Sequence, residues 1–170
     1  FKMENIIDYA KTELHTMDIK EFNDVDSLIL SQLSYIKLDE LIGTIDSNSD
    51  SILLKDLLKA EFFPKMFKDI AYAEQTKDLL FNLCSNPRFR NIKINYHISK
   101  TDPIFEKQFS ATTFILNENL AYIAFRGTDY SIVGWKEDFN MSFKSHVASQ
   151  LDAVEYLNNV ASKYENKIRV

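Results

Sequence analysis

Three adjoining segments decide the fold, and they read Gln108-Phe109-Ser110-Ala111-Thr112-Thr113-Phe114-Ile115-Leu116, then Asn117-Glu118-Asn119, then Leu120-Ala121-Tyr122-Ile123-Ala124-Phe125-Arg126-Gly127-Thr128. The outer two segments are rich in aromatic and β-branched residues, which favour strands. The three residues between them have the length of a hairpin connection. We therefore expect residues 108–116 and 120–125 to pair as antiparallel neighbours. The second strand runs into Gly127, which permits a sharp turn or the close approach of another group.

A helix and a further strand are expected after this hairpin. One long helix is predicted near residues 148–164, because apolar residues recur there at helical spacing. Residues 167–170 then have the pattern of a strand. Strand, connection, helix and strand make a βαβ unit, which implies that the two strands are parallel.

The first half of the chain has mainly helical patterns, with segments expected at 5–14, 23–36, 52–63 and 74–84. Asn23 or Asp24 is suited to cap the second helix, and Pro64 interrupts the third or opens the next segment. Between this half and the hairpin, Ile92, Ile94, Tyr96 and Ile98 alternate with polar residues. That period predicts a half-buried strand.

Composition narrows the class of protein. The chain has 170 residues, of which 45 % are apolar and 13 % aromatic, as in a globular domain. Its 20 basic and 25 acidic residues give a net charge of −5, which argues against a nucleic-acid partner. No apolar run approaches the ~20 residues of a membrane span, and we identify no targeting segment. The single cysteine, Cys84, excludes an intrachain disulfide and is typical of a reducing compartment, most simply the cytoplasm.

Glycine is scarce, and this excludes several kinds of site. The three glycines, Gly43, Gly127 and Gly134, form neither a G-x-G-x-x-G loop nor a G-x-S-x-G nucleophile elbow. The zinc patterns C-x-x-C and H-E-x-x-H are absent as well. We expect no cofactor and no metal.

The segment after the hairpin carries a family resemblance. Phe125-Arg126-Gly127-Thr128 followed by Gly134-Trp135-Lys136-Glu137-Asp138-Phe139-Asn140 resembles the class 3 lipases of the α/β-hydrolase superfamily. More closely, residues 22–170 resemble a bacterial family of lipase-like hydrolases without an assigned activity. The stretches 22–35 and 150–157 contribute to this likeness.

The resemblance implies an α/β fold made of an N-terminal helical region, residues 1–88, followed by the N-terminal half of an α/β-hydrolase core, residues 89–170. The sheet is expected to be mixed and mostly parallel, and the whole to be one incomplete domain. The strand at 167–170 matches the one that leads into the nucleophile elbow. We expect it to have a neighbour on one side, with a second copy or a missing C-terminal segment covering the open sheet edge.

By the same resemblance, Thr128 matches the oxyanion-hole position, with Arg126, Gly127, Asp129, Trp135 and Asp138 supporting the turn around it. The nucleophilic serine and its acid and histidine partners would lie beyond Val170, so the chain is expected to be truncated before them. The implied activity is hydrolysis of a small acyl ester or a lipid through an acyl-enzyme. This chain would supply an oxyanion-hole residue and be inactive alone.

Two alternatives remain open. The fold could serve as a non-catalytic binding or scaffolding module, since fold alone does not settle function. The chain could instead be one fragment of a cut protein whose partner supplies the rest.

Several of these residues also have structural interpretations. Arg126 is expected to fix the turn through Asp129, Glu137 or Asp138, because charge pairs of this kind are common. Trp135 is expected to pack in the core or in a loop.

The three histidines, His15, His97 and His146, are interpreted as surface residues, since none has a nucleophile at an informative spacing. Cys84 falls in an apolar helical stripe and is interpreted as a small buried hydrophobe.

Overall fold

The structure is a computed structural model that describes residues 5–39, 41, 51–102, 107–126, 148–163 and 167–170. Its α-helices are α1 (Ile6–Thr12), α2 (Asp24–Leu33), α3 (Phe63–Met66), α4 (Ala73–Ser85) and α6 (Ala148–Lys163), and short 3₁₀ helices cover Leu54–Leu57 and Ala60–Phe62. The strands are β1 (Ile52–Leu53), β2 (Lys93–Asp102), β3 (Lys107–Asn117), β4 (Leu120–Arg126) and β5 (Lys167–Arg169).

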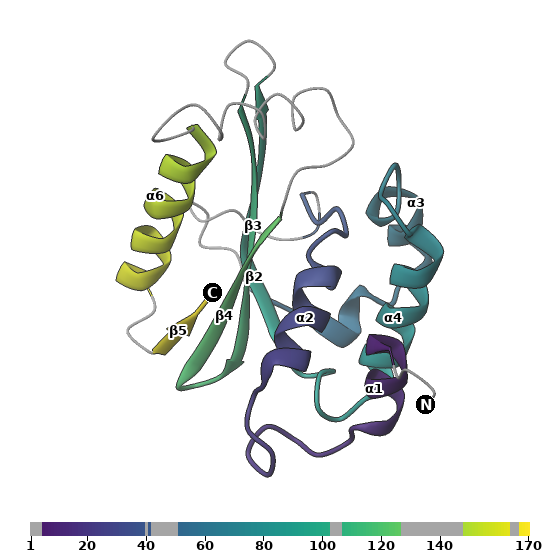
Figure 1. Cartoon of the computed structure of the whole chain (residues 1–170). Helices are drawn as coiled ribbons and strands as arrows, with labels where there is room; N and C mark the ends of the chain where they lie inside the picture. Colours follow the sequence, from purple (N-terminus) through teal and green to yellow (C-terminus); the bar gives the residue numbers. More distant parts are fainter. Residues whose placement is uncertain (1–4, 40, 42–50, 103–106, 127–147, 164–166) are drawn as a thin grey trace.

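The strands form one sheet in the order β1-β2-β3-β4-β5 (Figure 1). The expected hairpin is confirmed, because β3 and β4 pair antiparallel with Thr113 opposite Ile123. The predicted parallel pair is also confirmed, since β4 and β5 run in the same direction with Tyr122 opposite Arg169. Among the described strands β5 pairs with β4 alone.

The expectation of a mostly parallel sheet is wrong. The pairs β1·β2, β2·β3 and β3·β4 are antiparallel, and only β4·β5 is parallel, so the α/β sheet is mixed but mostly antiparallel. The physical reason lies in the connections. A parallel pair needs a long crossover, here the segment containing α6, whereas the short connections from β2 to β3 and from β3 to β4 return the chain antiparallel. The long segment from β1 to β2, which contains α3 and α4, returns it antiparallel as well.

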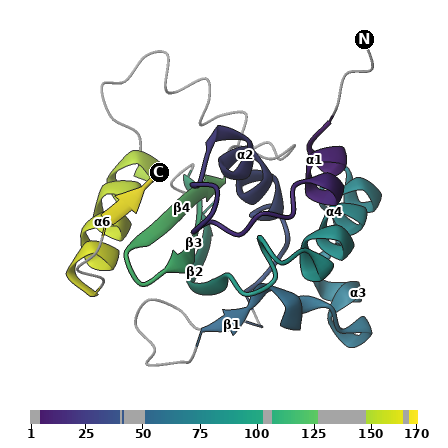
Figure 2. The same cartoon turned by 90° about the horizontal axis from the view of Figure 1, so that it is seen from below.

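Helices cover both faces of the sheet (Figures 1 and 2). Helix α6 packs on one face around Phe109, Ile123 and Tyr156, which we call the α6 face. The other face, which we call the inner face, packs against α1, α2 and α4 around a larger core that includes Leu30, Leu80, Phe89, Phe114 and Tyr122. The inner core thus joins residues from both halves of the chain.

Helices α1 and α2 begin at polar caps. Asn23 is the N-cap of α2, and its side chain accepts hydrogen bonds from the backbone N–H groups of Val25 and Asp26. Helix α1 has an equivalent cap at Asn5. Of the two residues suited to cap the second helix, the structure places Asn23 in this role and Asp24 in the first turn.

The predicted helix at 52–63 is wrong for most of its length. Ile52 and Leu53 form β1 beside β2, and the N–H of Leu54 donates to the carbonyl oxygen of Ile92 at 2.8 Å. Two 3₁₀ turns follow, and Pro64 then lies in the first turn of α3, where its missing N–H is not needed.

A bulge in β2 changes which side chains face which core. Asn95 pairs with Thr113 and Ile98 with Ala111, so Tyr96 and His97 together oppose Thr112 alone. Tyr96 takes a φ of +53°, a left-handed value that is uncommon outside glycine. Because the extra residue shifts the alternation, Ile94 packs into the inner core while Tyr96 and Ile98 pack on the α6 face.

A buried ion pair ties the chain's beginning to the sheet. The guanidinium Nε of Arg88 donates to Asp26 Oδ1 at 2.9 Å, and neither side chain is exposed. Arg88 also donates to the backbone carbonyls of His15, Lys20 and Glu21. This network fixes the connection between α1 and α2 against the segment that precedes β2.

Candidate functional site

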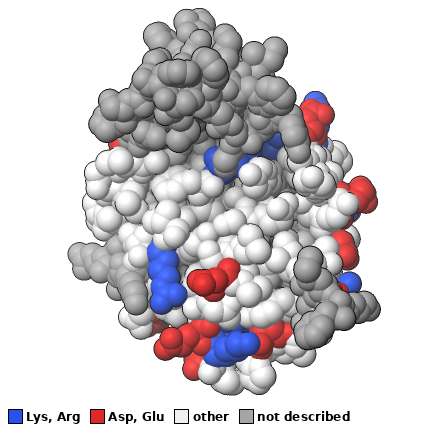
Figure 3. Space-filling view, viewed as in Figure 1, with Lys and Arg blue, Asp and Glu red and all other residues white. Residues whose placement is uncertain are grey.

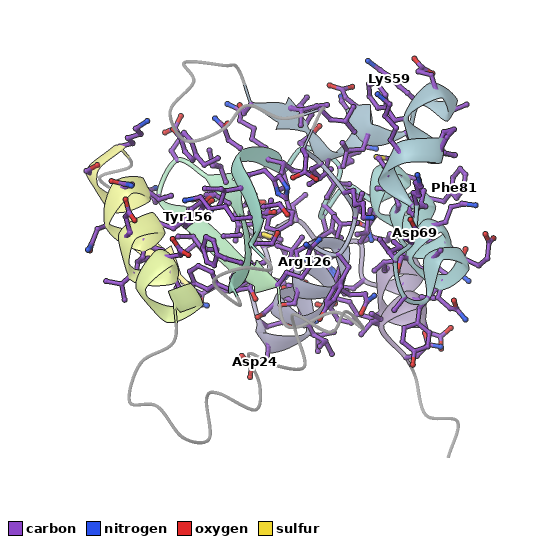
Figure 4. The ribbon with its side chains drawn as sticks, turned by 90° about the horizontal axis from the view of Figure 1, so that it is seen from above. Asp24, Lys59, Asp69, Phe81, Arg126 and Tyr156 are labelled. Atoms are coloured by element: carbon purple, nitrogen blue, oxygen red, sulfur yellow. The ribbon has the colours of Figure 1, made fainter. Side chains whose placement is uncertain are left out.

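The candidate site begins at the carboxyl end of β4, where Arg126 is the last described residue before the next gap. Ser110 of β3 lies directly opposite Arg126, and Ser99 of β2 lies opposite Ser110. The guanidinium of Arg126 reaches Ser99 Oγ at a long distance of 3.5 Å. Figure 4 looks onto this end of the sheet and shows Arg126 between the strands and α2.

Polar side chains gather on the inner face at this end of the sheet. Cross-strand partners share a face, which places Arg126, Ser110 and Thr112 together with Ala124, a member of the inner core. The bulge brings His97 of β2 to the same face. We call this group the polar strip, and its members are His97, Ser99, Ser110, Thr112 and Arg126.

His97 is a buried member of the polar strip, with a relative exposure of 2 %. Its Nδ1 lies 2.8 Å from Thr112 Oγ1, and its Nε2 lies 3.2 Å from Asp39 Oδ1. Since both ring nitrogens are engaged, His97 has none left to exchange a proton with a substrate. The prediction that His97 is a surface residue is therefore wrong, and the bulge, which turns the ring onto a covered face, is the cause.

Asp39 faces the polar strip from the connection after α2. Its side chain is half exposed, in contrast to the buried imidazole that it contacts. The hydrogen bond with His97 is the main cause that lowers the pKa of Asp39 below its ordinary value, and the positive charge of Arg126 contributes in the same direction. The carboxylate therefore lies within the electrostatic reach of both groups.

Ser110 has a hydroxyl that is not used by the described residues. The residue is 2 % exposed, and its Oγ has no hydrogen-bond partner in the part of the chain that the structure describes. Buried hydroxyls almost always have a partner. With respect to the described residues, the polar strip therefore has one hydroxyl that can still donate or accept.

Most of the residues predicted from the resemblance lie outside the described ranges. They are Gly127, Thr128, Asp129, Trp135 and Asp138. The expected partner Glu137 and the histidine His146 lie outside as well. Of the predicted set, only Arg126 is placed, at the end of β4 and beside Ser99.

Two other predictions concern described residues and are confirmed. His15 is largely exposed and contacts Glu13, as expected for a surface histidine. Cys84 is buried among the inner core, and desolvation raises the pKa of its thiol to about 12. Such a thiol is a packing residue and is too weakly ionised to act as a nucleophile.

Sequence reasoning did not identify Asp39, Ser99, Ser110 or His97 as parts of one site. Their positions along the chain carry no motif, and the bulge that unites them has no glycine to mark it. From the alternation of Ile94, Tyr96 and Ile98, His97 would lie on the opposite face of the strand from Ile94. The bulge instead places both residues on the inner face.

A cavity of about 500 Å³ lies at the opposite end of β4. Its lining includes Met17, Phe22, Leu120 and Arg169. Because Leu120 begins β4 and Arg126 ends it, this cavity is separate from the polar strip.

The described ranges give little support for a metal site, a membrane-spanning helix or a large charged patch. No group of three His, Cys, Asp or Glu side chains is arranged there to hold a metal ion. Within the same ranges, no helix combines the length and apolarity that crossing a bilayer demands. Figure 3 shows basic and acidic side chains interspersed near the lower edge of one face, without one large patch of either sign on its described part.

Comparison with known proteins identifies a family. A family model described as Mbeg1-like matches residues 83–170, which run from the end of α4 to β5 and include His97 and Arg126. No curated protein and no solved structure matches the chain. The family's name states neither a reaction nor a ligand.

Proposed function

The chain belongs to the Mbeg1-like family, and we propose that it supplies the oxyanion-hole half of a lipase-like serine hydrolase with an α/β-hydrolase fold. The reaction is hydrolysis of an acyl ester, a small ester or a lipid, through an acyl-enzyme. The catalytic serine and its partners belong to sequence beyond Val170. A cytoplasmic location, suggested by the single cysteine, is part of the same proposal.

The parallel pairing of β4 with β5 is the observation that supports this proposal most. Leu120 lies opposite Lys167 and Tyr122 opposite Arg169, so β5 begins beside the start of β4 and runs the same way. Parallel strands end at one edge of a sheet, where α/β folds bind their ligands. A serine at the end of a continued β5 would therefore lie at the same edge of the sheet as Arg126.

The composition of that edge supports the same chemistry. Thr128 comes two residues after Arg126, where a backbone N–H and a hydroxyl suit a developing oxyanion. The polar strip, which includes Arg126, adds hydroxyls and one guanidinium, groups that tolerate negative charge. An apolar strip would suit a packing surface better than a reaction centre.

A fluorophosphonate probe tests the proposal, because it reacts covalently with activated serines. We expect the intact parent protein to be labelled at one serine and the 170-residue chain to remain unlabelled. Labelling of the short chain would show that the nucleophile has been misplaced. An unlabelled, folded parent would favour a non-catalytic binding or scaffolding module.

The oxyanion role is tested separately with Thr128→Val in the parent. Loss of one oxyanion donor typically costs a factor of about 10²–10³ in kcat. If only the hydroxyl is lost and the backbone N–H remains, the reduction will lie at or below the lower end of that range. Thr12→Val is the matched control, since Thr12 is exposed in α1 and far along the chain from β4. Equal turnover in the two variants would place the oxyanion hole elsewhere.

A further inference from the structure

Aromatic side chains form a connected group on the side of the molecule that carries α3 and α4. The ring of Phe63, at the start of α3, lies edge-on to Phe67 with ring centres 5.6 Å apart and edge-on to Phe81 of α4 with ring centres 5.9 Å apart. Phe81 has a relative exposure of 45 %, and Phe62 and Phe63 are partly exposed. This group therefore reaches the surface of the protein.

Lysine side chains lie over rings of the same region. The ammonium of Lys59 is 5.5 Å from the ring centre of Phe62, and that of Lys77 is 5.6 Å from the ring centre of Phe67. Leu58, beside Lys59, has a relative exposure of 40 %. We call this surface the aromatic–lysine face, and its members are Leu58, Lys59, Phe62, Phe63, Lys77 and Phe81. Figure 4 shows Lys59 and Phe81 on the side of the molecule opposite the yellow helix α6.

We propose that the aromatic–lysine face binds the surface of a phospholipid bilayer that contains anionic lipids. The exposed parts of Leu58, Phe62 and Phe81 enter the boundary between head groups and acyl chains, while the ammonium of Lys59 stays at the level of the phosphates. This binding goes beyond the proposed function, because it does not depend on a catalytic serine.

The side chains of the face have the chemistry that a lipid surface requires. Aromatic rings have a large apolar area that is stabilised by contact with acyl chains. A lysine lays its methylene stem along apolar neighbours and keeps its ammonium in water, and Lys59 over Phe62 already has this arrangement. Helical segments that lie in a membrane interface combine lysine with phenylalanine and leucine in the same way.

The local charge favours an anionic surface. Residues 54–68 contain four lysines and two carboxylates, a net charge of +2 in a chain whose net charge is −5. Asp69 and Glu74 follow this segment, and Glu74 already contacts Lys77 at 3.0 Å. The positive excess therefore lies over the 3₁₀ turns and α3. An anionic membrane attracts this side of the protein and repels the more acidic remainder, which orients the protein on the membrane.

A protein partner or a nucleic acid fits the face less well. Protein interfaces are enriched in arginine and depleted in lysine, whereas the cations of this face are both lysines. A nucleic acid is bound through a basic surface that neutralises several phosphates, and a local charge of +2 on an acidic chain is small for that purpose.

Cosedimentation with vesicles tests the proposal. We expect the protein to bind vesicles of equal parts phosphatidylcholine and phosphatidylglycerol, to bind phosphatidylcholine vesicles more weakly, and to be released by salt, which screens the attraction. Lys59→Gln should lower the partition coefficient on the mixed vesicles by about fivefold, the factor that corresponds to one lysine near an anionic surface. Leu58→Ser should weaken binding to both kinds of vesicle, because it removes apolar contact and leaves the charge unchanged.

Two exposed side chains of α6 provide matched controls. Lys163 also lies over an aromatic ring, that of Tyr96, at 5.9 Å, and Val154 has a relative exposure of 58 %. Lys163→Gln and Val154→Ser should leave vesicle binding unchanged. All four substituted side chains are exposed, so each variant should keep the wild-type thermal unfolding curve.

The proposal is overturned if the wild-type protein does not bind the mixed vesicles, or if the two α6 variants lose as much binding as Lys59→Gln and Leu58→Ser. A second copy of the chain on this face would give another result. The protein would then associate with itself without vesicles, and Leu58→Ser would abolish that association, which would also overturn the proposal. An unlabelled parent in the fluorophosphonate experiment would refute the proposed function and leave the vesicle result unaffected.

Discussion

The pair formed by Asp26 and Arg88 shows how one residue can stabilise a distant segment. Both side chains are fully buried, and Arg88 also satisfies three backbone carbonyls of the connection between α1 and α2. Breaking a buried pair leaves an uncompensated charge, which costs more than the pair itself contributes. We expect Asp26→Asn to lower the free energy of unfolding by about 3 kcal/mol, measured by urea denaturation.

Asp24→Asn provides the control for that measurement. Asp24 lies two residues away on the same helix, but its side chain is exposed and points away from the ribbon in Figure 4. Its interaction with the helix dipole is worth less than about 1 kcal/mol. If both variants lose the same stability, the buried pair has no special role.

Asp39 predicts a dependence of stability on pH. Its pKa is lowered in the folded chain, chiefly by the hydrogen bond with His97. A carboxyl with a lowered pKa adds stability above its unfolded pKa, and this contribution disappears as pH falls through the folded value. We expect wild type to exceed Asp39→Asn in stability near neutral pH and the difference to shrink as pH falls below the ordinary carboxyl pKa of about 4 toward the lower folded pKa. A constant difference across this range would contradict the assignment.

For single residues, the sequence predicts the burial of some side chains and not of others. The apolar stripe of α4 identifies Cys84 as buried, because a helical period needs only the neighbouring residues. His97 could not be predicted in the same way. Its burial depends on a one-residue insertion in β2, and nothing in the residues around Tyr96 marks a bulge.

Among the elements, α6 makes its hydrogen-bonded contact with the bulge through the hydroxyl of Tyr156. Tyr156 OH lies 2.8 Å from Thr113 Oγ1 and donates to the carbonyl of Tyr96, and burial raises the pKa of this phenol. Figure 4 shows Tyr156 extending from α6 toward the strands. Tyr156→Phe removes the hydroxyl and leaves buried partners unsatisfied, at a cost of about 1–3 kcal/mol.

Hydrogen exchange measures this effect on the element itself. We expect faster exchange in α6 and around Tyr96 in Tyr156→Phe, with α2 and α4 changed less. Tyr72→Phe is the control, since Tyr72 has a relative exposure of 66 %. An unchanged α6 would show that apolar packing on Phe109 and Ile123 is sufficient to hold the helix.

The segment from 52 to 63 shows why an element can be predicted wrongly from its pattern. Leu54 and Leu57 are both buried and three residues apart, which fits an α-helix and a 3₁₀ turn equally well. The backbone contacts of Leu54 and Lys55 with the chain before β2 decide between them. Such tertiary contacts are not visible in a local pattern.

For the whole molecule, the hairpin and the βαβ unit were predictable because each depends on neighbouring segments and a connection of known length. The mostly antiparallel pairing of the strands was not predictable in this way. The strand directions were inferred from the resemblance, and β1 was not foreseen as a strand. The candidate site divides in the same way. Arg126 follows from the strand that it ends, whereas Asp39, Ser110 and His97 come together only through folding.

The single cysteine offers a measure of how the whole molecule unfolds. Cys84 lies in the inner core, which joins α1, α2 and α4 to the sheet, and its thiol has a pKa raised to about 12. Both burial and the low thiolate fraction protect it from a thiol reagent. We expect Cys84 to react only through opening of this core, so its rate should rise with urea as steeply as global unfolding does.

The control places a thiol on the same helix but outside the core. Phe81 of α4 has a relative exposure of 45 % and lies at the outer side of the molecule in Figure 4. In the double variant Cys84→Ala, Phe81→Cys, the new thiol should react at nearly the rate of a free thiol and show little dependence on urea. Asp26→Asn should accelerate labelling of Cys84 by about 10²-fold, because a loss of about 3 kcal/mol in stability raises the open population by that factor. If Cys84 is labelled fast, and neither urea nor Asp26→Asn changes the rate, α4 opens alone. The inner core would then not join the two halves of the chain into one cooperative unit.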